Sequence, residues 1–157
     1  MIRTILTVYD LLRDTIIPPR PTETIVRALT LEKLLSLPQT GSTLPYHDES
    51  VRALVWEIKY YANSRAVALC GSILGEALIE ATQDSLGKPL LIPIPMHASR
   101  RKDRGYNQTE MLAKAALVHA GDFVDYAPNI VVRAVNTSPQ QGLPQHKRRH
   151  NVAGSMK

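Results

Sequence analysis

Apolar residues recur with a helical period along much of the chain. Spacings of three and four residues between them predict amphipathic helices over 2–14, 23–37, 51–60, 65–83 and 108–119. Pro18, Pro19 and Pro21 end the first helix, because proline lacks an N–H and restricts the residue before it. The chain therefore begins with a helical region and loop, residues 1–45.

Two apolar segments without that period predict strands. Residues 90–95 (LLIPIP) and 130–135 (IVVRAV) are short and apolar, and the second is rich in β-branched side chains. Pro93 and Pro95 favour a strand end or a sheet edge for the first. A basic loop, 97–106, and a helix lie between the two strands, which is the order of a βαβ unit. The predicted fold class is α/β, with a parallel sheet flanked by helices and the basic loop where such sheets bind ligands.

Length and composition fit one globular domain and exclude several classes of protein. The 157 residues are 44% hydrophobic and 21% charged, which argues against disorder and fibrous repeats. No apolar run is long enough for a membrane span, and the first residues do not read as a secretory signal. The single cysteine, Cys70, excludes an internal disulfide and a cysteine-based zinc site, so we expect a cytoplasmic protein with no metal site. Cys70 lies on an apolar helix face and is expected to be a small buried hydrophobe.

Positive charge is concentrated in two segments. The net charge is +5, and residues 97–104 (HASRRKDR) and 146–150 (HKRRH) carry most of the excess. Such clusters indicate an anionic partner, either the phosphates of a small molecule or a nucleic-acid backbone. The alternative is a solvated basic surface.

Two motifs are more specific than the charge. The first contains Pro93-Ile94-Pro95-Met96-His97, Arg100-Arg101 and Arg104-Gly105-Tyr106-Asn107-Gln108. The second contains Arg133, Thr137, Gln140, Gly142-Leu143, Arg148 and Asn151-Val152. In this order the motifs resemble the ComF family, which belongs to the type I phosphoribosyltransferase-like proteins. The resemblance covers roughly residues 44–157.

The resemblance implies a partial type I phosphoribosyltransferase-like fold over residues 46–157. It also implies a glycosyltransferase activity, the transfer of a phosphoribosyl group from phosphoribosyl diphosphate to an acceptor that the sequence does not identify. Mg²⁺ would accompany the diphosphate in the complete protein, because its charge must be offset as it departs. Paired cysteines that look like a zinc site in some family members are missing here, so no zinc is expected.

The first motif supplies the candidate phosphate-binding residues, which are Arg100, Arg101, Arg104 and Gly105. Arginines and backbone N–H groups suit a diphosphate, and Gly105 would allow the backbone to turn sharply. Contacts to the acceptor, or to a hood over the site, are assigned to His97, Tyr106, Asn107, Gln108, Gln140, Arg148 and Asn151. The structural alternatives are that Arg104, Asn107 and Gln108 brace the following helix, that His97 bonds to its own loop, and that Tyr106 is a packing anchor.

The second motif lies in a basic arm, residues 136–157, with no core periodicity. In the resemblance this arm is a mobile hood over the site, from which Arg148 or Arg149 could reach phosphates. It could equally bind a partner or nucleic acid. We expect it to be poorly ordered without the rest of the fold around it.

One element of the family pattern has no counterpart in the sequence. Type I phosphoribosyltransferases carry two adjacent carboxylates and a Thr/Gly loop after an apolar strand, and these hold the ribose hydroxyls and the 5′-phosphate. The only adjacent acidic pair here is Asp48-Glu49, which follows a proline-containing loop. The expectation is therefore an N-terminal part of a family member that is inactive alone, with an open strand edge that promotes self-association.

Two other functions remain open at this point. A nucleic-acid-binding or accessory protein in competence and DNA uptake is suggested by the family association and the basic segments. Against it, aromatic residues make up only 5% of the chain, which leaves few platforms for stacking of single-stranded DNA. The other reading is a remnant with no function.

Overall fold

A computed structural model describes Asp14 and residues 18–38, 44–138 and 142–157. The chain divides into two compact units, Met1–Tyr61 and Ala62–Lys157, and each is described by itself. No helix in the described ranges has the length and apolar character needed to cross a membrane.

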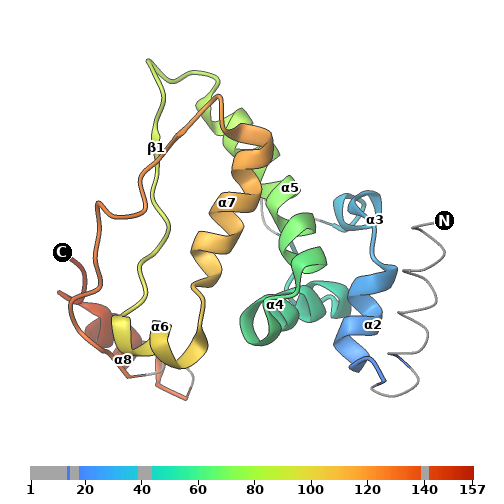
Figure 1. Ribbon diagram of the computed structural model, residues 1–157, viewed down its shortest axis with the longest axis horizontal. Coiled ribbons are helices and arrows are strands. Elements are labelled where there is room, and N and C mark those ends of the chain that lie inside the picture. Colours follow the sequence, from blue (N-terminus) through green and yellow to red (C-terminus); the bar gives the residue numbers. More distant parts are fainter. Residues whose placement is uncertain (1–13, 15–17, 39–43, 139–141) are drawn as a thin grey trace. The chain divides into compact units, whose positions relative to one another are not determined.

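The first unit contains three described helices: α2 (Pro21–Ala28), α3 (Leu31–Leu35) and α4 (Glu49–Tyr61) (Figure 1). α2 packs against α4. The core consists of fully or almost fully buried aliphatic side chains: Val26, Leu29, Leu34, Val51, Leu54 and Ile58.

The helix predicted over 23–37 is wrong, because the segment forms two helices. Leu29 and Thr30 are extended, and the Thr30 side chain accepts a hydrogen bond from the Lys33 N–H at 3.2 Å, which caps α3. Pro21 begins α2 in the position where proline costs no hydrogen bond. The helix predicted over 2–14 lies outside the described residues except for Asp14.

The helix predicted over 51–60 is confirmed and begins two residues earlier. The Asp48 carboxylate accepts hydrogen bonds from the N–H groups of Ser50 and Val51, at 2.8 and 3.3 Å, and so caps α4.

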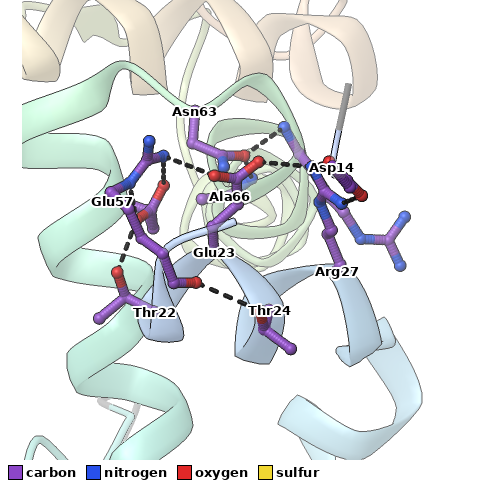
Figure 2. A network of polar contacts seen from close by, with 10 residues as sticks. Asp14, Thr22, Glu23, Thr24, Arg27, Glu57, Asn63 and Ala66 are labelled. Atoms are coloured by element: carbon purple, nitrogen blue, oxygen red, sulfur yellow. Dashed lines mark hydrogen bonds and ion pairs between the residues drawn. The ribbon is translucent and has the colours of Figure 1, made fainter. Parts of the chain in front are cut away.

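A buried carboxylate lies inside this unit. The Glu57 side chain is fully buried on α4 and accepts two hydrogen bonds from the Arg20 guanidinium, at 3.1 and 2.7 Å, and one from the Thr22 hydroxyl at 2.6 Å. Figure 2 shows this network, which continues through Glu23 to Arg27 and Asp14. Hydrogen bonding to Glu57 raises the pKa of Arg20. A buried charge paired in this way ties the segment before α2 to α4.

The second unit is built on two long helices, α5 (Ser64–Thr82) and α7 (Gln108–Ala120), which pack side by side (Figure 1). Both were predicted, over 65–83 and 108–119. The contact is made by small residues, because Gly71 lies against Ala115 and Gly75 against Ala116 and His119.

Cys70, on α5, is only partly accessible to solvent. Burial raises the pKa of its thiol to about 11, so the thiol stays protonated at neutral pH. This fits the expected packing role.

The sheet has two parallel strands, β1 (Leu90–Leu91) and β2 (Asp125–Tyr126), with Leu90 opposite Asp125 and Leu91 opposite Tyr126. The predicted strand over 90–95 pairs only at its first two residues, because Pro93 and Pro95 have no N–H to donate. The described chain is therefore mostly helical, with a minor parallel sheet.

The strand predicted over 130–135 is wrong as a partner of the first strand, since β2 precedes it. Arg133 instead forms an isolated antiparallel bridge with Met156, and next to it Val132 and Lys157 exchange hydrogen bonds at 2.8 and 3.0 Å. Ile130, Val132 and Val135 are each at least half exposed. The β-branched composition indicated an extended backbone and did not specify its partner.

Two short helices occupy segments predicted to lack them. Residues of the predicted loop 97–106 form α6 (Ala98–Arg104), and the arm contains α8 (Gln145–Val152). The loop prediction was wrong because a run of charged residues has no apolar period, although it can form a solvated helix when both ends are capped.

Candidate phosphate-binding site

The residues of the candidate site follow the carboxyl ends of the two strands in the sequence. After β1 the chain runs through the extended Pro93–His97 segment into α6, turns at Gly105 and enters α7. After β2 the chain runs toward α8, and Figure 1 shows α6 and α8 at the same end of this unit.

His97 and Gly105 form the two ends of α6. The His97 ring nitrogen Nδ1 accepts from the Ser99 N–H at 3.3 Å and lies 2.8 Å from the Ser99 hydroxyl. Gly105 has φ +83°, which favours glycine, and its N–H donates to the Arg101 carbonyl at 2.8 Å. The turn predicted at Gly105 is confirmed, and His97 has the structural role of an N-cap.

Arg101 is paired with a carboxylate on α7. Its guanidinium donates to both oxygens of Glu110, at 2.5 and 2.8 Å. This bidentate pair lowers the pKa of Glu110 and raises that of Arg101, in both cases mainly through hydrogen bonding. Arg101 therefore braces α6 against α7 and already has an anionic partner.

Asn107 is buried and fixes the start of α7. Its side-chain oxygen accepts from the Thr109 N–H at 3.1 Å, while its amide nitrogen donates to the Ile94 carbonyl at 3.0 Å. The Thr109 hydroxyl donates to the same carbonyl at 2.7 Å. In this structure Asn107 therefore braces the start of α7, which was the structural alternative to a contact with substrate. Tyr106 and Gln108, on either side, are half-buried.

Arg100 connects the first motif to the second. Its guanidinium donates to the carbonyl of Thr137, and Arg133 donates to the Thr137 hydroxyl at 2.6 Å. Thr137 is buried, so one residue of the second motif receives an arginine from each motif. Two segments separated by α7 and β2 are thereby brought together.

The arm is held by hydrogen bonds from its own polar side chains. Arg148 donates through Nε to the Leu143 carbonyl at 2.9 Å, and Asn151 donates to the Ser138 carbonyl at 2.8 Å. Both residues were predicted to contact substrate, and in this structure both stabilise the backbone of the arm. Gln140, also predicted, lies outside the described residues.

Several cations remain exposed on α6 and α8. The side chains of Lys102, Arg104, Lys147 and Arg149 are exposed, and within the described ranges none of them forms a hydrogen bond or an ion pair. Asp103 on α6 is exposed as well. Of the four phosphate-binding residues predicted, Arg104 is therefore the one whose charge is most available to a ligand.

Sequence reasoning missed Glu110, Tyr126 and the hub role of Thr137. Asn107 and Glu110 have the spacing of a capping box, a signal that could have identified the carboxylate. The Tyr126 hydroxyl is buried without a hydrogen-bond partner among the described residues, and burial raises its pKa. No local pattern marks Tyr126, because its burial depends on the pairing of β2.

Comparison with known proteins adds no relative. No protein-family model matches the chain, and neither a curated protein nor a solved structure does. A function for this chain is therefore argued from the residues of the two motifs and their geometry.

Proposed function

We propose that the chain is a ComF-like phosphoribosyltransferase-family protein whose second unit binds phosphorylated small molecules such as phosphoribosyl diphosphate. The observation that carries this proposal is the bond from Arg100 to the Thr137 carbonyl. It joins the two motifs beyond the carboxyl ends of parallel strands, where open α/β sheets bind ligands.

Within this proposal the motif residues divide into two groups. Arg100, Arg101 and Asn107 hold α6, α7 and the second motif together. Lys102 and Arg104 on α6, with Lys147 and Arg149 on α8, supply charge to phosphate oxygens. Guanidinium groups suit phosphate because they can donate two parallel hydrogen bonds.

Transfer of the phosphoribosyl group to an acceptor, with Mg²⁺ offsetting the diphosphate charge, is proposed only together with an acidic ribose-binding loop of the kind the resemblance implies. Phosphate binding is the part that this chain's own residues support.

A second candidate function rests on the exposed residues of α8. Residues 145–150 of this helix are exposed and include the cations Lys147, Arg148 and Arg149, which present positive charge to nucleotide phosphates. Binding of single-stranded DNA would then use charge with little base stacking.

Isothermal titration of the full chain with phosphoribosyl diphosphate, with and without Mg²⁺, tests the first proposal. We expect saturable binding that weakens about tenfold in Arg104→Gln, because one charge-assisted hydrogen bond contributes roughly 1.5 kcal/mol. Lys88→Gln is the matched control, since it removes one exposed positive charge before β1 and should leave the affinity unchanged.

A parallel titration with oligothymidylate separates the two candidates. Tight binding of the oligonucleotide with a steep salt dependence, and none of the small molecule, would favour the second function and reject the first.

A further inference from the structure

The solvent face of α4 is unusually apolar and aromatic. Val55, Trp56 and Tyr60 are 40%, 49% and 41% exposed, while Val51 and Leu54 on the other side of the helix are buried. A surface helix normally presents charged and polar residues to water. α4 therefore exposes apolar and aromatic side chains in addition to the face that packs in the core.

Two aromatic rings form the centre of this face. The ring centroids of Trp56 and Tyr60 are 4.4 Å apart with an interplanar angle of 49°, and Lys59 Nζ lies 5.0 Å from the Tyr60 centroid. Trp56 is the only tryptophan in the chain. Tryptophan and tyrosine are enriched among the residues that dominate binding energy at protein interfaces.

Charges of opposite sign lie along the same face. Glu49 is exposed in the first turn, Arg52 follows one turn later, and Lys59 lies in the last turn. Spacings of three and four residues place all of these on one side of the helix with the aromatic rings. Glu49 and Lys59 are ten residues apart, about 15 Å along the axis, so they do not pair within one helix.

We propose that this face binds a second copy of the chain, with the two α4 helices antiparallel. In that arrangement Glu49 of each copy lies beside Lys59 of the other. The same register places Arg52 of each copy beside Trp56 of the other, where a cation–π contact can form.

The order of the charges favours a second copy over other occupants. An acidic first turn and a basic last turn are complementary to themselves only when the helices run antiparallel, which is the isologous contact of a twofold dimer. A parallel pair would place like charges together. A nucleic-acid surface would not carry the exposed Glu49 carboxylate at one end.

Sedimentation equilibrium of the full chain over a range of concentrations tests the proposal. We expect a reversible dimer that dissociates about tenfold more readily in Glu49→Lys and in Lys59→Glu, because each change places like charges together at two symmetric positions. The double variant Glu49→Lys/Lys59→Glu should restore the dimer. Glu80→Lys, an equal charge change at an exposed position of α5, should have no effect.

Circular dichroism of each variant checks that α4 still folds. The fluorescence of Trp56 reports whether the exposed face of α4 becomes covered. A monomer at all concentrations would overturn the proposal. A dimer that is insensitive to both charge reversals, or to Trp56→Ala, would also overturn it and would indicate association through the strand edge. Quenching of Trp56 by oligothymidylate in a monomeric chain would reassign the face to nucleic acid.

Discussion

The two units of this chain are stabilised in different ways. The first contains a fully buried carboxylate, Glu57, held by an arginine and a threonine from the α2 side (Figure 2). The second has a seam of small residues between α5 and α7, where Gly71 lies against Ala115. The first unit therefore has a paired buried charge beside its aliphatic core, and the second has a helix contact that requires the absence of a side chain.

The two units should therefore be sensitive to different kinds of substitution. A buried ion pair contributes little net stability compared with apolar packing, yet removing one partner is costly because it leaves the other charge unpaired in the interior. A close helix contact depends on volume, so even one added methyl group forces the helices apart. Substitutions should therefore act on the first unit through charge and on the second through size.

The largest effect is expected for Arg20→Leu. It removes both guanidinium hydrogen bonds to the buried Glu57 carboxylate, and we expect a loss of about 3 kcal/mol in the free energy of unfolding. Glu57→Gln should cost less, about 1 kcal/mol, because Arg20 is 38% exposed and can be hydrated. Urea denaturation followed by Trp56 fluorescence measures both.

Arg27→Leu is the matched control for this substitution. Its partners Asp14 and Glu23 are 27% and 17% exposed, so its removal should cost much less than that of Arg20. Equal losses for Arg20→Leu and Arg27→Leu would show that burial of Glu57 does not matter.

The second effect concerns the seam between α5 and α7. A Cβ at position 71 would lie 2.4 Å from the Ala115 Cβ and 2.9 Å from its carbonyl carbon, so we expect Gly71→Ala to destabilise by about 2 kcal/mol. Alanine has the higher helix propensity, which works against this loss. Thermal unfolding followed by circular dichroism should show partial recovery in Gly71→Ala/Ala115→Gly, and a stabilised Gly71→Ala would refute the close contact.

The smallest effect is the pH dependence of the Arg101–Glu110 pair. The pKa of Glu110 is lowered in the folded state, so its contribution is present above the unfolded pKa of about 4.3 and is lost as pH falls through the folded value. Because Arg101 is 53% exposed, we expect less than about 1 kcal/mol. Arg101→Gln should reduce the loss of stability on acidification, measured by urea denaturation, whereas Lys88→Gln should not. An unchanged pH profile in Arg101→Gln would argue against the pair.

The long helices were predictable from the sequence, whereas the sheet was only partly so. The apolar periods of α4, α5 and α7 were sufficient to place these helices, but they match the buried faces only in part, because Val55 on α4 and Val118 on α7 are exposed. β2 is two residues long, with a half-buried Tyr126, and the more strand-like segment 130–135 pairs elsewhere. Strand pairing is decided by contacts between distant residues, which a local pattern does not contain.

In the candidate site, too, the local sequence pattern does not show which single residues contact each other. The charge clusters indicated where α6 and α8 carry their cations, and Gly105 was identified as a turn. The pattern could not distinguish Arg101, which pairs with Glu110, from Arg104, whose side chain is exposed. That distinction depends on where α7 places a carboxylate after the turn.

The central claim, phosphate binding by the second unit, is tested most directly by titrating the ¹⁵N-labelled chain with phosphoribosyl diphosphate and following the amide chemical shifts. We predict saturable shifts concentrated in α6, at Thr137 and in α8, with the amides of α2 and α4 unchanged. Shifts confined to the first unit, or no shifts at millimolar ligand, would contradict it.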